Sequence, residues 1–117
     1  MTIPPFDKEQ NIETYTAGQT VFREGDPGNR MFIILEGTID IVIRGKSVAT
    51  LESGNIFGEM ALIDKNPRSA TAMAKTNAKL AAINEDRFME MVKENPRFAL
   101  RIMSVLAARL RRMDEKL

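Results

Sequence analysis

The sequence predicts a mainly β fold followed by two C-terminal helices. Short apolar stretches alternate with glycine-containing turns over residues 15–84, which is typical of short strands. The pattern becomes helical from residue 85 onwards, and residues 97–117 contain neither glycine nor proline. Several short strands with glycine-rich turns are typical of a sandwich, a barrel or a jelly roll. We therefore expect a single domain over 1–117, with a β-roll over about 15–84 and helices over about 85–117.

The predicted strands lie between turn signals such as Gly18, Gly37 and Gly54. Each strand candidate combines apolar and β-branched residues, and the stretch 38–43 alternates in part, as a half-buried strand should. The predicted strands are 20–23, 31–35, 38–43, 47–51, 70–74 and 78–83.

The two predicted helices are separated at Pro96, a residue that is tolerated in the first turn of a helix. Residues 85–95 place apolar side chains among charged ones, and the second helix carries two apolar stripes. One stripe is spaced alternately four and three positions apart, like a heptad seam. This seam favours a homodimer through the C-terminal helix, and a broad buried face within a monomer is the alternative. The seam residues are Ala99, Met103, Leu106, Leu110, Met113 and Leu117.

The composition argues against several classes of site. The chain has no histidine and no cysteine, so the usual ligands of zinc, haem and iron–sulfur centres are missing, as are His-based triads and Cys nucleophiles. The net charge of +1 creates no overall field for nucleic acid or an anionic membrane. No apolar run approaches the ~20 residues of a membrane span. We expect a cytoplasmic binding protein rather than an enzyme, with no metal site and no cofactor.

The segment 56–71 carries the side chains that suit a nucleotide. Gly58 permits close backbone approach, and the helix-forming run after it would direct N–H groups at an anion. Arg68 offers a planar fork of donors for phosphate oxygens, with the hydroxyl of Ser69 beside it. Glu59 can accept hydrogen bonds from ribose hydroxyls. The alternative is a surface ion pair between Glu59 and Arg68, which contributes only ~0–1 kcal/mol.

This segment resembles the phosphate-binding cassette of cyclic-nucleotide-binding domains. The pattern of that cassette is Phe-Gly-Glu-x-Ala-Leu, a short loop, and Pro-Arg-(Ala/Ser/Thr)-Ala-Thr, and residues 57–62 and 67–71 match every defining position. The similarity also covers the segments 15–18, 22–28 and 33–37. Bacterial catabolite activator proteins, regulatory subunits of protein kinase A and cyclic-nucleotide-modulated channels share this domain. The resemblance implies a β jelly roll that holds its ligand inside and is capped by a long C-terminal helix.

The resemblance also implies a role for each site residue. Arg68 and Ser69 bind the cyclic phosphate, and Glu59 holds the ribose 2′-hydroxyl. The backbone N–H groups around the cassette glycine assist with the phosphate; these belong to Gly58, Met60 and Ala61. The base contacts fall on Val48, Ala49 and Met113. Ile41 also lies where the family packs apolar groups near the base, but plain core is expected for it, and plain core stays the alternative for Val48 and Ala49.

The residues determine the choice between nucleotides less clearly than they determine the phosphate site. Met113 stands where the family has a polar residue that contacts the base, and its side chain offers no useful hydrogen bond. Ser69 is seen with cAMP in catabolite activator proteins, so cAMP is the expected ligand and cGMP the alternative. We expect a non-catalytic sensor that signals through its C-terminal helices to an unidentified effector protein, with no nucleic acid or membrane partner.

Three other functions are alternatives to this one. The main alternative is the ligand-sensing fragment of a catabolite-activator-type transcription factor, since the chain stops at Leu117 without a DNA-reading element. A metal-dependent jelly-roll enzyme would need histidines. A domain that had lost its ligand would not be expected to keep Gly58, Glu59, Arg68 and Ser69.

Overall fold

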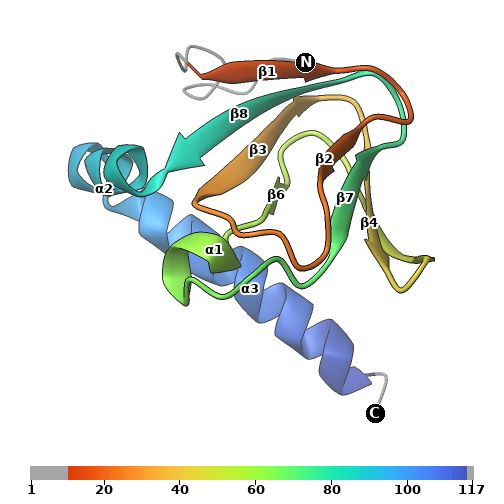
Figure 1. Ribbon diagram of the computed structural model, residues 1–117. Coiled ribbons are helices and arrows are strands. Elements are labelled where there is room, and N and C mark those ends of the chain that lie inside the picture. The colour runs from red at the N-terminus through yellow and green to blue at the C-terminus, as the bar shows by residue number, and fades with distance from the viewer. Residues whose placement is uncertain (1–10, 116–117) are drawn as a thin grey trace. The chain divides into compact units, whose positions relative to one another are not determined.

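The computed structural model describes the backbone of residues 11–115 and the side chains of residues 11–112. The chain divides into two compact units, one ending at Asn84 and one beginning at Glu85. The first unit is built from strands and one short helix, and the second consists of two helices (Figure 1). The mainly β fold with two C-terminal helices is therefore confirmed.

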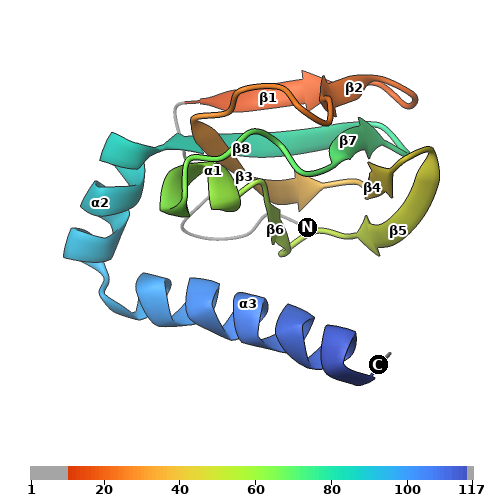
Figure 2. The ribbon, with the colours of Figure 1, turned by 60° about the horizontal axis from the view of Figure 1, so that its bottom comes forward.

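The β unit consists of two antiparallel four-stranded sheets, with the strand orders β1-β8-β3-β6 and β2-β7-β4-β5. Consecutive strands such as β3 and β4 fall in different sheets, which is the winding of a jelly roll (Figure 2). The elements are β1 Ile12–Tyr15, β2 Thr20–Phe22, β3 Arg30–Glu36, β4 Ile39–Ile43, β5 Lys46–Leu51, β6 Ile56–Phe57, α1 Met60–Ile63, β7 Thr71–Ala74 and β8 Ala78–Asn84.

Two strands were not anticipated from the sequence. Strand β1 directs Glu13 and Tyr15 towards the more buried side and leaves Ile12 exposed, so its alternation is the reverse of an ordinary amphipathic strand. Strand β6 is only two residues long and forms through its pairing with Phe32 and Ile33 of β3. Both depend on partners distant in sequence, and local patterns carry little information about such pairing.

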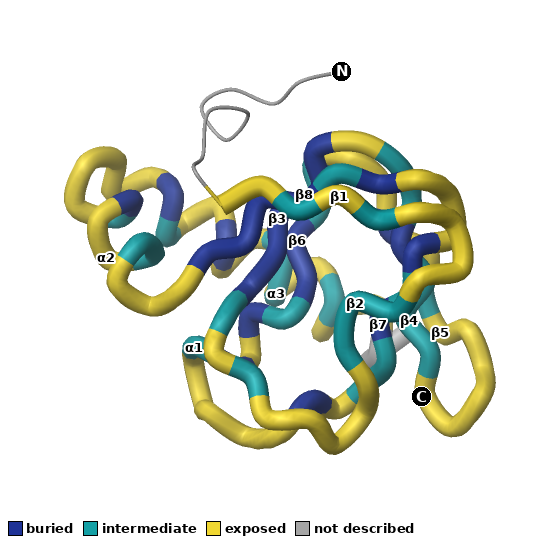
Figure 3. The backbone as a smooth tube through the Cα atoms, turned by 45° about the horizontal axis from the view of Figure 1, so that its top comes forward, coloured by how far each residue is buried: buried dark blue, intermediate teal, exposed yellow. Residues whose placement is uncertain are grey.

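The core is centred on β3, whose apolar run Met31–Leu35 is buried throughout. Figure 3 shows the buried backbone gathered along β3, β6 and β8. Ile41 and Ala49, paired across β4 and β5, pack against the interior cluster, which confirms Ile41 as a core residue. Each fully buried large aliphatic side chain contributes about 1.5–3 kcal/mol. The interior cluster consists of Phe32, Ile34, Ile39, Leu51, Phe57, Ala72, Ala74, Ala78, Leu80 and Ala82.

The helical unit consists of α2 Glu85–Glu94 and α3 Arg97–Glu115. The helical conformation is interrupted between them at Pro96. The side-chain oxygen of Asn95 accepts a hydrogen bond of 3.2 Å from the N–H of Arg97. The rings of Phe88 and Phe98 join the two helices edge to face, with centroids 5.5 Å apart. This ring contact fixes how the helices meet.

The predicted heptad seam lies along α3, and two of its residues are largely exposed to solvent. Met103 is 60% exposed and Leu110 is 62% exposed, while the side chains of Met113 and Leu117 lie outside the described residues. No helix in the described part of the chain combines the length and apolarity needed to cross a membrane.

Candidate functional site

The cassette begins where β6 ends, and Gly58 turns the chain there with a positive φ of 74°. A β-carbon at this position would lie 2.7 Å from Nη1 of Arg68, so glycine is needed both for the backbone conformation and for the space. The single turn of α1 follows at once, and the chain then returns through an exposed loop to Arg68. The predicted turn after Gly58 is therefore present.

Arg68 is buried, with 9% of its surface exposed, and its guanidinium is held by two backbone carbonyls. Nη1 donates to the carbonyl oxygen of Gly58 at 2.9 Å, and Nη2 donates to the carbonyl oxygen of Arg30 at 2.8 Å. The central carbon of the guanidinium lies 4.0 Å from the ring centroid of Phe22, within the range of a cation–π contact. These contacts fix the position of the guanidinium.

One donor of this guanidinium remains unsatisfied. Nε of Arg68 is buried and has no hydrogen-bond partner among the residues that the structure describes. A buried donor without a partner costs about 1–3 kcal/mol, and more when it is charged. Burial lowers the pKa of Arg68, the charge of Arg30 lowers it further, and Asp26 and Glu59 oppose these effects. Since arginine stays protonated in proteins, the site offers a fixed positive charge, and Nε of Arg68 can still donate a hydrogen bond.

The backbone of Arg68 is anchored by the turn between β2 and β3. Its N–H donates to the carbonyl oxygen of Asp26 at 2.8 Å, and its own carbonyl oxygen accepts from the N–H of Gly25 at 2.7 Å. Within the same turn, the carboxylate of Asp26 accepts a hydrogen bond of 3.0 Å from the N–H of Arg23. Arg68 is therefore positioned by a segment more than 40 positions away, and sequence patterns did not reveal this contact.

The other cassette residues differ in exposure. Glu59 is 4% exposed and occupies the position before α1, but its side chain does not cap this helix. Ala61 is buried, and its N–H donates to the carbonyl oxygen of Gly58 at 3.3 Å. The side chains of Met60 and Ser69 are exposed. The carbonyl oxygen of Gly58 thus accepts hydrogen bonds from both Ala61 and Arg68.

The predicted base contacts lie on β5 or outside the described side chains. Ala49 is partly buried against the interior cluster. Val48 lies at the register shift between β4 and β5 and is 52% exposed. Met113 belongs to α3, but its side chain is outside the described residues. These three assignments remain predictions.

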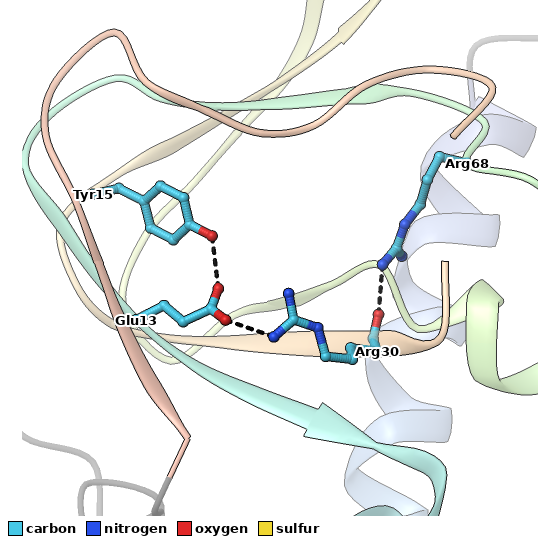
Figure 4. Close-up of polar contacts among 4 residues, drawn as sticks. All are labelled: Glu13, Tyr15, Arg30 and Arg68. Carbon is cyan, nitrogen blue, oxygen red and sulfur yellow. Dashed lines mark hydrogen bonds and ion pairs between the residues drawn. The ribbon is translucent and has the colours of Figure 1, made fainter. Parts of the chain in front are cut away.

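A polar network that the sequence did not reveal extends from β1 to Arg68 (Figure 4). The hydroxyl of Tyr15 donates to one carboxylate oxygen of Glu13 at 2.6 Å, and Nη1 of Arg30 donates to the other at 2.5 Å. Burial raises the pKa of Glu13, but the hydrogen bonds from Tyr15 and Arg30 and the charge of Arg30 outweigh it, so this pKa lies below its ordinary value. Burial, with the hydrogen bond to Glu13 and its charge, raises the pKa of Tyr15 to about 12.

Comparison with known proteins links this geometry to one family. The sequence profile of the cyclic nucleotide-binding domain matches residues 12–95. A cAMP-dependent protein kinase regulatory subunit from Schizosaccharomyces pombe is 43% identical over 79 residues, which make up 67% of this chain and 19% of that protein. A CRP-like cAMP-activated global transcriptional regulator from Mycobacterium tuberculosis is 30% identical over 120 residues, covering 98% of this chain and 54% of that protein.

The fold comparison agrees with the sequence comparison. The crystal structure of the Thermus thermophilus catabolite activator protein matches with a TM-score of 0.82 and 29% identity, over 91% of this chain and 52% of that chain. The chain spans 54% of the mycobacterial regulator and 19% of the kinase subunit. The matched profile, the relatives and the shared jelly roll place this chain in the cyclic nucleotide-binding domain family.

Proposed function

We propose that this protein binds cAMP through the cassette and acts as a non-catalytic regulatory module. The observation that carries the proposal is Nε of Arg68, a buried and charged donor without a partner beside the cassette turn. A cyclic phosphodiester carries a single negative charge and oxygens that accept hydrogen bonds, so it would satisfy this donor and neutralise the guanidinium. The names of both curated relatives refer to cAMP, which supports this nucleotide over cGMP.

In this proposal each site residue has one task. Arg68 and Ser69 bind the phosphate with backbone N–H groups of the cassette turn, and Glu59 accepts a hydrogen bond from the ribose 2′-hydroxyl. Glu59 is 4% exposed, and a hydrogen bond to its carboxylate would be stronger where water is excluded. We assign the base contacts to Val48 and Ala49 on β5, and the contact from Met113 stays a sequence-based prediction.

The output of the sensor is carried by the helical unit. The exposed apolar positions Met103 and Leu110 on α3 support a homodimer through this helix, with an effector protein responding to the ligand. A ligand shifts such a helix only by binding one of its positions more tightly than the other. We place this activity in the cytoplasm.

A second candidate function is ligand sensing within a longer transcription factor. This candidate is favoured by the similarity to the mycobacterial regulator and to the catabolite activator protein, of which the chain covers 54% and 52%. Cyclic nucleotide binding is common to both candidates.

Calorimetric titration with cAMP and cGMP tests the proposal, using the wild type, Arg68→Ala and the control Lys46→Ala. Lys46 is the exposed first residue of β5, so its removal takes away one positive charge without touching the cassette. We expect saturable binding of cAMP, retained in Lys46→Ala and weakened by roughly 2–5 kcal/mol in Arg68→Ala, as for one partner of a buried charge pair. Equal affinity of Arg68→Ala and wild type, or no binding by a folded wild type, would overturn the assignment.

A further inference from the structure

The carboxylate of Glu13 lies on the more buried side of β1, an edge strand of its sheet. Strand β1 turns Glu13 and Tyr15 towards its more buried side, and Tyr15 packs against the interior cluster. The side chain of Glu13 is only 32% exposed. Because burying a charge costs free energy unless the charge is paired, the carboxylate needs the two hydrogen bonds that it accepts.

The partner of this carboxylate is close to the anion site. Arg30, whose guanidinium donates to Glu13, also supplies the carbonyl oxygen that accepts from Nη2 of Arg68. The guanidinium carbons of Arg30 and Arg68 lie 5.2 and 5.9 Å from the ring centroid of Phe32. Their separation therefore does not exceed about one Debye length, which is about 10 Å at 0.1 M salt.

The charge of Arg30 acts on the ligand arginine in this arrangement. Its positive charge contributes to lowering the pKa of Arg68, so the two cations repel one another. A second cation at this distance would strengthen the attraction for any anion in the site, and most of all for an anion with two charges. Glu13 opposes this effect, because its carboxylate is bonded directly to Arg30.

We propose that Glu13 is a specificity-determining residue that matches the charge of the site to a singly charged ligand. By neutralising Arg30, it leaves the fixed charge of Arg68 to face the single charge of a cyclic phosphodiester. A doubly charged phosphate monoester then finds only one unbalanced cation. The inference rests on the proposed binding of cAMP, and it adds discrimination against open-chain phosphates such as 5′-AMP.

The pair cAMP and 5′-AMP isolates this effect, since both carry the same base and sugar. A phosphate monoester loses its second proton near pH 6, so 5′-AMP is a dianion at about pH 7.5 and largely a monoanion at about pH 5. The chain has no histidine, and the pKa of Glu13 lies below its ordinary value, so Glu13 stays ionised while 5′-AMP titrates in this interval. The groups facing Glu13 are Tyr15 on its own strand and Arg30 on β3, while Lys79 of β8 pairs with Thr14.

The test measures the dissociation constants of cAMP and 5′-AMP by calorimetry on the full chain, at both pH values. The variants are Glu13→Gln and the double variant Glu13→Gln with Arg30→Gln, and the control is Glu52→Gln, an exposed carboxylate outside the network. At about pH 7.5 we expect Glu13→Gln to shift the affinity ratio towards 5′-AMP by about three- to tenfold. The shift should vanish at about pH 5 and in the double variant, and Glu52→Gln should match the wild type.

The outcomes separate this inference from the proposed function. If the wild type binds cAMP and Glu13→Gln leaves the ratio unchanged, or if the shift persists at the lower pH, the role of Glu13 is overturned while cAMP binding stands. If the folded wild type binds no cyclic nucleotide, both proposals are overturned. Should Glu13→Gln fail to fold, Arg30→Gln alone provides the test. It removes the second cation and must shift the ratio away from 5′-AMP by a similar factor, and an unchanged ratio would contradict the inference.

Discussion

The guanidinium of Arg68 lies against the backbone of Gly28, with no room for a side chain between them. A β-carbon on Gly28 would stand 2.4 Å from Nε, 2.5 Å from the central carbon and 2.8 Å from Nη2 of Arg68. These distances are shorter than any real contact of a β-carbon, and they involve the group that we assign to the phosphate. The backbone of Gly28 lies outside the left-handed region, so the need for glycine here is one of space.

Gly28→Ala should therefore weaken cAMP binding. The new methyl group displaces the guanidinium from the carbonyl oxygens of Gly58 and Arg30, and such overpacking costs about 1–3 kcal/mol. We expect a lower affinity by calorimetry and a lower midpoint of thermal unfolding. In the background of Arg68→Ala the same substitution meets no guanidinium and should cost little further stability. An affinity equal to that of the wild type would show that Arg68 does not depend on this contact.

Replacement of Phe22 should affect the ligand more than replacement of its neighbour Phe57. The two rings belong to one cluster, with centroids 5.9 Å apart, but the guanidinium of Arg68 lies over Phe22. Phe22→Leu keeps an apolar side chain and removes a cation–π contact of roughly 0.5–2 kcal/mol, so both stability and cAMP affinity should fall. Phe57→Leu is the matched comparison, and because Phe57 begins the cassette without lying under the guanidinium, it should lower stability with a smaller loss of affinity. If the two substitutions lowered the affinity for cAMP equally, the loss of affinity would be due to packing and not to the cation–π contact.

Glu59→Gln should weaken binding by roughly 1.5–3 kcal/mol, the value of a hydrogen bond to a charged group. The reason is the proposed contact between the carboxylate and the ribose 2′-hydroxyl. Titration with 2′-deoxy-cAMP provides the control, since this ligand lacks the hydroxyl. The wild type should prefer cAMP over the deoxy ligand, and the variant should bind both with similar affinity. If Glu59→Gln still preferred cAMP over 2′-deoxy-cAMP, the ribose 2′-hydroxyl would not contact Glu59.

The titration of Tyr15 reports directly on the network with Glu13 and Arg30. Tyr15 is the only tyrosine and the chain has no tryptophan, so the absorbance of phenolate follows this residue alone. We expect a pKa of about 12 in the folded protein, against an ordinary value of 10.0. Between these values the unfolded chain releases a proton that the folded protein keeps. The stability contributed by Tyr15 is therefore complete below pH 10 and is lost as the pH rises towards 12.

The same titration in Glu13→Gln should give a lower pKa for Tyr15. The variant removes the hydrogen bond to the carboxylate and the negative charge, both of which raise this pKa, while the contribution of burial remains. A wild-type pKa near the ordinary value would contradict the network. An unchanged pKa in the variant would show that Glu13 does not act on the phenol.

The elements predicted correctly from the sequence are those with local causes. Gly58, the helix-forming turn after it and Arg68 lie within a short stretch, so their residue types and spacing define the cassette. The turn glycines mark the strand ends, and Pro96 marks the break between the two helices. Each of these features depends on the conformational preferences of nearby residues, and a sequence displays such preferences directly.

The residues that support Arg68 depend on the tertiary structure. Gly28 and Arg30 reach it from the turn and strand that follow β2, and the bond from Nη2 spans 38 positions. Glu13 lies within hydrogen-bond distance of Arg30 because β1 and β3 both pair with β8. Sequence patterns predict a nucleotide site with an arginine at its centre, because the cassette is contiguous. The surroundings and the charge balance of that arginine follow from strand order and register, which bring together residues that no local pattern connects.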